Sequence, residues 1–500
     1  MRPSSSPSEW GEPSIAPPVD ASDPFAVVFG DPRVDQACGT DGWLGAMLDA
    51  ERALAEALAE AELVPVAAAK AIGEACRSGG VTSAVFAHAS SASPVVPLVN
   101  TLAEAVPLEV RGWVHYGATS QDIMDTAMML VAHRATAVIV DNLAHAAEAA
   151  ASLTERHRDT LLIGRTLGQH AAPTTFGAVA AGWLSGIDAA RDQLRSARFE
   201  LAAQLGGPVG TLEPYGTQGL RVLADFAHRL GLADPGLPWH TERTRVTRLA
   251  SALATGAGTL AKVAHDVSVL GSSDVGELRE GSGGGSSAMP HKHNPADSVL
   301  VLANVRRTPG LAATMFAALE SELQRPAGAW QSEWQTLSQL LRCCGGASSR
   351  ASSLLSGLRV DTGRMRSHLD ATGGLLRAGA VADQLAPALG RREAHELIAD
   401  LAARAETATF DGQSSAADHK PPGWAQLGDQ SERPDQPSAP HGPPGAGQAT
   451  FREFLDADPT VTAHLTAAEL DAACDPTACL PAARALVDRA LARHRAQEEP

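Results

Sequence analysis

Residues 281–295 read Gly-Ser-Gly-Gly-Gly-Ser-Ser-Ala-Met-Pro-His-Lys-His-Asn-Pro, a glycine-rich segment that ends in a turn held between two prolines. The glycines leave the backbone free to aim several N–H groups at an anion. Hydroxyl groups follow on Ser286 and Ser287, and then Lys292 and Asn294 offer an ammonium and an amide suited to carboxylate oxygens. A flexible linker explains the glycines and serines but does not need the stiff polar turn, so we interpret the segment as a binding loop.

Two other kinds of glycine-rich site do not fit this segment. A phosphate-binding P-loop needs Gly-Lys-Ser/Thr at the start of a helix, and here His293 follows Lys292. A hydrolase nucleophile elbow needs Gly-x-Ser-x-Gly, and neither Ser286 nor Ser287 has that context. The anion that the loop binds is therefore more simply a carboxylate.

The chain around the loop has the apolar periodicity of helices. Apolar residues recur every three to four positions, the spacing of one helical face, and alternating strand patterns are nearly absent. Such stretches begin at Thr40, which can cap a helix, and continue at 123–154, 176–205, 244–271 and 298–319. Long helices with few strands predict an all-α protein built on an extended helical bundle.

Two polar stretches interrupt this pattern. Residues 1–24 are rich in serine and proline and predict a disordered leader. Residues 411–450 carry many prolines and glycines and almost no aliphatic side chains, which predicts a disordered insert. Helical spacing resumes at Phe451.

The composition excludes several classes of protein. The charged residues sum to 40 − 57 = −17, which disfavours binding to nucleic acid or to an anionic membrane surface. No stretch approaches the roughly 20 apolar residues of a membrane span, and the N-terminus lacks a signal-peptide core. Six scattered cysteines indicate neither a disulfide framework nor a metal site. We therefore expect a cytoplasmic protein without a metal.

At this point the loop shows a resemblance. Its end, GSSAMPHKHNP, is similar to the GSSxMPxKxNP signature of the fumarase/aspartase superfamily, and the rest of the chain resembles the cycloisomerase branch of that family. The resemblance covers about residues 25–405. Further stretches that carry it are VHYGATSQDIMDTA at 114–127, GRTLGQHAAPTTFGAVAAGWL at 164–184, LPWHTERTRV at 237–246, RPAGAWQSEWQTL at 325–337 and LDATGGL at 369–375.

The resemblance implies a three-domain architecture and a shared active site. It predicts an N-terminal helical domain at 25–113, a central long-helix domain at 114–364, and a C-terminal helical domain at 365–500 that carries the insert. It also predicts a homotetramer whose active sites combine segments of several subunits, with no metal or organic cofactor. The expected substrate is a small di- or tricarboxylate.

The resemblance also assigns roles to residues. Ser286 is the expected base, and His170 is a second catalytic candidate. The reaction passes through a carbanion delocalised into a carboxylate, which needs several hydrogen-bond donors fixed in advance. The expected substrate-binding residues are His115, Thr119, Ser120, Gln169, Ser287, Met289, Lys292 and Asn294.

For three other residues the sequence leaves a functional and a structural role open. Arg165 can grip a carboxylate or brace a neighbouring helix, Glu333 can belong to the site or to a solvated helix face, and His240 is more simply structural. The chain also departs from the family. Leu167 stands where fumarases and adenylosuccinate lyases have a histidine, which argues against those activities. His293 replaces the cation usual in cycloisomerases, which weakens binding of a third carboxylate.

The expected function is a cofactor-free cycloisomerase that converts 3-carboxy-cis,cis-muconate to 4-carboxymuconolactone, a step of the protocatechuate branch of the β-ketoadipate pathway. A β-elimination lyase that releases fumarate from a substituted succinate such as nitrosuccinate is the alternative within enzymes. An inactive helical scaffold is the alternative of another class, but it has no need of Ser286, Lys292 and Asn294 together.

Overall fold

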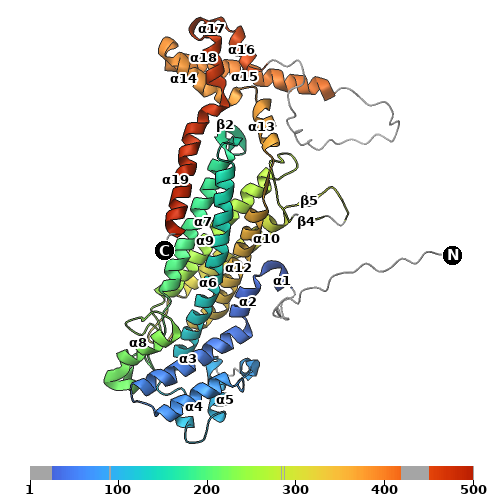
Figure 1. Cartoon of the computed structure of the whole chain (residues 1–500). Helices are drawn as coiled ribbons and strands as arrows, with labels where there is room; N and C mark the ends of the chain where they lie inside the picture. Colours follow the sequence, from blue (N-terminus) through green and yellow to red (C-terminus); the bar gives the residue numbers. More distant parts are fainter. Residues whose placement is uncertain (1–24, 89–91, 283, 286–287, 418–449, 499–500) are drawn as a thin grey trace, which may run out of the picture. The chain divides into compact units, whose positions relative to one another are not determined.

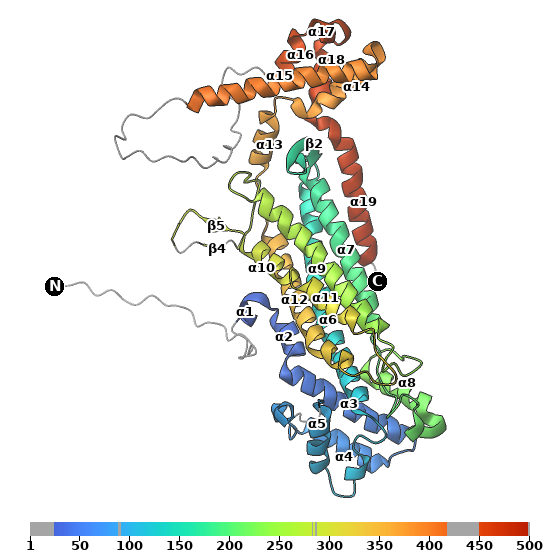
Figure 2. The same ribbon diagram turned by 180° about the vertical axis from the view of Figure 1, so that it is seen from behind.

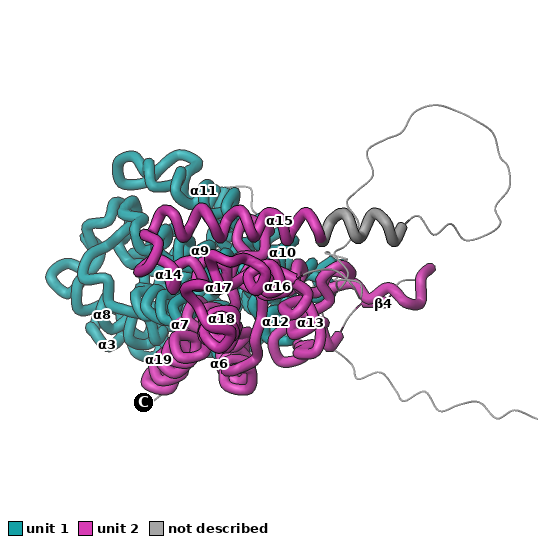
Figure 3. Tube along the Cα trace, turned by 90° about the horizontal axis from the view of Figure 1, so that it is seen from above, with its two compact units in different colours: residues 1–145, 189–264, 297–353 teal, residues 146–188, 265–296, 354–500 magenta. Residues whose placement is uncertain are grey.

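The computed structural model describes residues 25–88, 92–282, 284–285, 288–417 and 450–498. The chain divides into two compact units (Figure 3). Unit 1 comprises residues 1–145, 189–264 and 297–353, and unit 2 comprises 146–188, 265–296 and 354–500. The four longest central helices each contribute residues to both units: α6 (Ser120–Arg156), α7 (Phe176–Phe199), α9 (Thr244–Leu270) and α12 (Ala329–Gly357).

Unit 1 combines parts of these long helices with shorter ones (Figures 1 and 2). Helix α3 (Thr40–Glu60) forms because its apolar residues, among them Met47, Leu54 and Leu58, recur on one face, and that face is buried. The shorter helices of the unit are α1 (Ala26–Phe29), α2 (Pro32–Cys38), α3 (Thr40–Glu60), α4 (Val66–Arg77), η1 (Ser83–His88), α5 (Val95–Glu104), η2 (Arg111–Trp113), η3 (Glu213–Gln218), α8 (Gly219–Leu230), α10 (Ala296–Val305, from its second residue) and α11 (Thr308–Ala317).

Unit 2 contains a small helical core near the C-terminus. Leu385, Leu401, Phe451 and Leu455 are buried together there. Thr450 caps the helix after it with a capping box, in which its side chain and that of Glu453 each accept a backbone N–H. The helices of this unit are α13 (Thr362–Ala371), η4 (Leu375–Arg377), α14 (Ala378–Leu389), α15 (Arg391–Ala417), α16 (Phe451–Ala457), α17 (Pro459–His464), α18 (Ala467–Cys474), η5 (Pro476–Cys479) and α19 (Leu480–Glu498).

The strands of the described chain form three two-stranded antiparallel pairs, all in unit 2. The longest pair joins β1 (Leu161–Thr166) to β2 (Gln169–Thr175). The others are short and join β3 (Leu278–Arg279) to β6 (Arg359–Val360), and β4 (Gly284–Gly285) to β5 (His293–Asn294). The predicted all-α class is confirmed, but the sequence patterns did not indicate the β1–β2 hairpin.

The structure corrects several predicted boundaries. The helix expected at 298–319 is broken into α10 and α11, because Pro309 in the first turn of α11 cannot continue the preceding helix. Helix α7 ends at Phe199 rather than at 205, and no side chain caps α3, where Gly39 occupies the N-cap position. Helix α15 extends to Ala417, beyond the expected start of the insert at 411.

Other predictions about domains are not tested by the structure. The leader 1–24 and the rest of the insert, 418–449, lie outside the described residues. The division into three domains stays a prediction beside the two compact units. By length and composition α6 could cross a membrane, but 72% of its most apolar window is buried in the protein, as is typical of a core helix.

Candidate functional site

The signature loop forms a short hairpin in unit 2, with β4 and β5 as its sides (Figure 1). Asn294 pairs with Gly284 across it and is half-buried, while Met289 and Lys292 are exposed near its tip. The Lys292 N–H donates to the carbonyl of Met289 at 3.0 Å, which closes a turn around Pro290, at the start of the turn predicted between the prolines. The loop thus presents the Lys292 ammonium to solvent. Ser286 and Ser287 lie outside the described residues.

A close backbone contact anchors the start of this loop. A Cβ on Gly281 would lie 2.5 Å from the carbonyl oxygen of Gly357, at the end of α12. Such a distance is not tolerated, so position 281 needs glycine for packing. The first glycine of the segment therefore has a structural role in packing.

Three predicted site residues lie together where the chain enters α6 in unit 1. His115 and Thr119 are half-buried in the turn before the helix, and Ser120 is the first residue of the helix. The Thr119 N–H donates to Oδ2 of Asp122 at 2.9 Å. The Asp122 carboxylate thus satisfies a backbone N–H at the start of the helix and holds Thr119 in place.

Asp122 joins this turn to two other segments of unit 1. Its Oδ1 accepts from the Gly206 N–H at 2.8 Å and lies 2.7 Å from Nε2 of His240, and its Oδ2 accepts from the Gly207 N–H at 3.0 Å. Asp122 and His240 are buried. His240 is therefore a buried partner of Asp122, which agrees with the structural role expected from the sequence. Asp122 itself was not among the predicted site residues.

The other predicted pair, Gln169 and His170, lies on β2 of unit 2. Leu167 and Gly168 form the two-residue turn of the hairpin, with φ of 53° and 79°. Positive φ at both central residues is typical of a type I′ turn, whose twist matches that of the flanking strands. Leu167 is fully exposed in this turn. Gln169 and His170 are also exposed. The hairpin thus presents polar side chains next to an uncovered leucine.

Arg165 braces this hairpin. Its guanidinium donates two hydrogen bonds, of 2.9 and 2.7 Å, to the carboxylate of Glu277, whose side chain is fully buried. Nδ1 of His368 lies 2.7 Å from the same carboxylate. Arg165 thus has a bracing role, as one of its two interpretations expected, but its partner Glu277 lies directly before β3 and not on a neighbouring helix.

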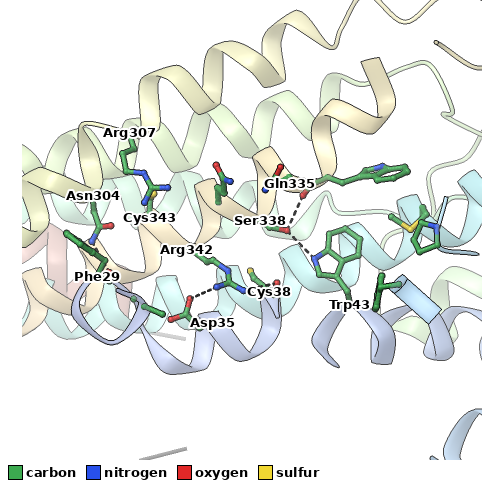
Figure 4. A pocket seen from close by; sticks show the side chains of 17 residues that line it. Phe29, Asp35, Cys38, Trp43, Asn304, Arg307, Gln335, Ser338, Arg342 and Cys343 are labelled. Carbon is green, nitrogen blue, oxygen red and sulfur yellow. Dashed lines mark hydrogen bonds and ion pairs between the residues drawn. The ribbon is translucent and has the colours of Figure 1, made fainter. Parts of the chain in front are cut away.

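A cavity of about 560 Å³ lies in unit 1, among residues that come from widely separated parts of the sequence (Figure 4). Trp43, Phe29 and Met124 give it apolar walls. Arg307 and Gln335 also line it, and among the described residues neither side chain has a hydrogen-bond or ion-pair partner. An apolar pocket with a few convergent donors is typical of a small-molecule site, and here the donors suit an anion.

The second arginine of the cavity has its charge balanced. Arg342 lies 3.5 Å from Oδ1 of Asp35 and donates to the carbonyl of Cys38 at 3.2 Å (Figure 4). Ser338 accepts from Nε1 of Trp43 at 3.1 Å. The wall is therefore held in place by its own contacts, and Arg307 is the cation that remains for a ligand. These residues were not predicted as site residues, although Trp334 and Gln335 of the stretch 325–337 line the cavity.

Glu333 does not lie on a solvated helix face. It is buried in unit 1 and bonded to Arg243, whose guanidinium also makes two hydrogen bonds, of 2.8 and 3.0 Å, to Asp125. Burial and the charge of Asp125 raise the pKa of Glu333, and together they outweigh the charge and hydrogen bonds of Arg243, which lower it. The solvated-face interpretation of Glu333 is therefore wrong, and its role in the site stays a prediction.

Comparison with known proteins agrees with these features. The family model described as "Lyase" matches residues 34–310, and the one described as "Adenylosuccinate lyase C-terminus" matches 374–490. The chain belongs to the lyases of the fumarase/aspartase type. It is 40% identical to a 3-carboxy-cis,cis-muconate cycloisomerase of Pseudomonas aeruginosa over 91% of this chain and 93% of the relative.

Two further relatives of this lyase are informative. A nitrosuccinate lyase of Streptomyces davaonensis is 39% identical, with 96% of each chain covered. The crystal structure of a 3-carboxy-cis,cis-muconate lactonizing enzyme from Pseudomonas putida superposes with a TM-score of 0.79 at 34% identity, covering 94% of this chain and 99% of that one. The resemblance inferred from the signature is therefore confirmed.

The described part of the lyase gathers its predicted site residues into three groups. They are the turn before α6, the tip of the β1–β2 hairpin, and the β4–β5 loop. Within the described ranges, no three histidine, cysteine or acidic residues are grouped so that they could hold a metal ion. The groups offer hydroxyl, imidazole, amide and ammonium donors, which are the functional groups that stabilise a developing carboxylate dianion.

Proposed function

We propose that this lyase is a cycloisomerase that closes 3-carboxy-cis,cis-muconate to 4-carboxymuconolactone. The observation that carries the proposal is the 40% identity to a cycloisomerase over nearly the whole chain, together with the signature loop at 281–295. In this reaction one substrate carboxylate adds to a carbon of the double bond. The electron pair of that bond moves toward a second carboxylate, and the α-carbon then takes up a proton.

Ser286 supplies that proton in the proposal, and Lys292 and Asn294 neutralise the carboxylate that accumulates charge. Thr119, Ser120 and His115, and likewise Gln169 and His170, bind the substrate from other subunits of the proposed tetramer. Ser287 and Met289 complete the proposed set of substrate-binding residues. The unit 1 cavity supports binding of a polycarboxylate, because its apolar walls accept a carbon skeleton and Arg307 accepts a carboxylate.

A β-elimination lyase acting on a substituted succinate is the second candidate. The alignment with the nitrosuccinate lyase covers 96% of both chains. In addition, the titratable His293 stands at a position where a permanent positive charge would strengthen the binding of a third carboxylate. In this direction Ser286 removes the α-proton, the carbanion collapses to the double bond of fumarate, and nitrite leaves with its electron pair.

Incubation with each substrate separates the two. The cycloisomerase proposal predicts loss of muconate absorbance and no fumarate from nitrosuccinate. Fumarate formation without loss of muconate absorbance would establish the alternative instead. Absence of both reactions in correctly folded protein would favour the scaffold.

We further propose that the lyase assembles as a homotetramer. Several large apolar side chains of unit 1 are exposed on or near α10 and α11, including Val299 at 53%, Phe316 at 49% and Leu323 at 80%. Burial of such side chains stabilises association. Light scattering is expected to give the mass of four chains, and a monomer at micromolar concentration would contradict this expectation.

A further inference from the structure

His115 has a strained backbone that its surroundings hold in place. Its φ is +58°, a left-handed value that costs a residue with a Cβ about 1–2 kcal/mol. The carbonyl of the next residue, Tyr116, accepts from the Tyr215 hydroxyl at 3.3 Å. Gly117 then packs so closely that a Cβ there would lie 2.6 Å from the ring of Tyr215. The turn is thus held by Tyr215 at the two residues that follow His115, which points to a functional requirement for the orientation of the imidazole.

Glu51 holds the ring from α3. Its Oε1 lies 2.6 Å from Nδ1 of His115, and only 1% of its side chain is exposed. Its other oxygen, Oε2, is buried and has no hydrogen-bond partner among the described residues. A buried carboxylate with an unsatisfied oxygen is costly, and a neutral glutamine could accept the same hydrogen bond. The hydrogen bond alone therefore does not explain a glutamate at position 51, and we look for an effect of its negative charge.

That charge determines the protonation of His115. Burial by itself lowers the pKa of His115, but the charge of Glu51, its hydrogen bond and the charge of Asp122 together raise the pKa above its ordinary value. The other titratable groups coupled to this cluster are Tyr215, whose pKa is raised, and Cys76, whose pKa is raised to about 12. Both stay neutral near neutral pH. His240, whose Nε2 lies 2.7 Å from Asp122, is the other titratable side chain in contact with this cluster.

We propose that Glu51 is a positioning residue that holds His115 as an imidazolium, with Nε2 turned toward a carboxylate of the substrate. Nδ1 is occupied by Glu51, and within the described part of the chain Nε2 has no partner. The side chain keeps 16% of its surface exposed, which leaves Nε2 a route to a ligand. The inference rests on the proposed function, because it assigns the carboxylate that His115 binds.

The sign of the pH dependence follows from the direction of the shift. A histidine whose pKa is raised in the folded protein stays protonated below that value and loses its charge as the pH rises through it. Carboxylate binding should therefore hold across the ordinary histidine pKa of 6.5 and weaken only at higher pH. Without the Glu51 charge, the loss should begin at lower pH.

The variant Glu51→Gln tests this. It keeps an acceptor for Nδ1 but removes the charge, so KM should stay within about threefold of wild type at pH 6 and rise about tenfold above it at pH 8, with kcat little changed. Glu51→Asp retains the charge and should restore part of the alkaline binding. Glu60→Gln, an exposed change on the same helix, should leave the profile unchanged. Parallel pH profiles of KM for wild type and Glu51→Gln would show that the pair is only structural.

A binding measurement keeps this inference separate from the proposed reaction. Propane-1,2,3-tricarboxylate is a non-reacting probe, and calorimetry at pH 6 and pH 8 measures its Kd without turnover. If neither muconate nor nitrosuccinate reacts, the proposed function fails, while a Glu51-dependent shift in probe binding still supports the positioning role.

His115→Asn provides an independent test if Glu51→Gln does not fold. It should bind the probe at least about tenfold more weakly than wild type at pH 6, with no further loss at pH 8. In that background Glu51→Gln should add nothing to the pH dependence, as expected for two residues that act as one unit. Probe binding by His115→Asn equal to wild type at both pH values would overturn the proposal.

Discussion

Replacing Ser286 with alanine should lower kcat at least about 100-fold, because the proposed reaction then lacks the group that exchanges a proton with the α-carbon. Binding should change much less, since Lys292, Asn294 and the donors of the other two groups remain. The expected signature is therefore a large fall in kcat with a KM close to wild type. Steady-state kinetics on whichever substrate reacts, muconate or nitrosuccinate, measures both constants.

Ser282→Ala is the matched control for this loss. Ser282 lies in the same glycine-rich segment but outside the Gly-Ser-Ser triplet of the signature. Its replacement should leave kcat within a few-fold of wild type. Turnover by Ser286→Ala within that same range would remove Ser286 from the proton transfer and leave the base to another side chain, of which His170 is the first candidate.

The ease of recognising this loop contrasts with the difficulty of recognising the β1–β2 hairpin. The loop has a long local signature, and long helices can be predicted from the periodic spacing of their apolar residues. The hairpin turns through Leu167-Gly168, where a leucine adopts a φ of 53°, and turn rules expect asparagine, aspartate or glycine at that position. A local rule broken near proposed site residues is consistent with function taking precedence over backbone preference.

Contacts between distant segments explain what the sequence could not predict. The sequence around Glu333 allowed a solvent-exposed position, because it contains no sign of the contact with Arg243, which is 90 residues away in the chain. The same holds for the pairing of Glu51 with His115 and for the unit 1 cavity, whose lining extends from Ala26 to Cys343. Residue types in these places were visible, but their partners are set only by the packing of the helices.

The Arg243 cluster should have the largest effect on stability. Arg243 has no exposed side-chain surface, and it separates two buried carboxylates, Asp125 and Glu333. Replacing it with methionine, a side chain of similar length, leaves both carboxylates without their cation. Removing one partner of a buried ion pair costs about 3–5 kcal/mol, so the free energy of unfolding should fall by roughly that amount. Urea unfolding at a fixed protein concentration measures the change.

An exposed arginine nearby gives the comparison. Arg248 on α9 pairs with Glu200, and both side chains are largely in solvent at 66% and 46% exposure. Arg248→Met should therefore cost no more than about 1 kcal/mol. Equal effects of the two substitutions would mean that burial does not set the strength of the Arg243 pairings.

The pH dependence distinguishes an uncompensated charge from a simple packing defect. The pKa of Glu333 is already raised, chiefly by burial, while Arg243 is present. Loss of the guanidinium removes the charge and hydrogen bonds that lower this pKa, so the pKa should rise further. A carboxyl whose pKa is raised in the folded protein takes up a proton as the pH falls, and that uptake stabilises the folded state. The deficit of Arg243→Met should therefore shrink between pH 8 and pH 5. Adding Asp125→Asn and Glu333→Gln should recover part of it at pH 8, whereas a packing defect would respond to neither change.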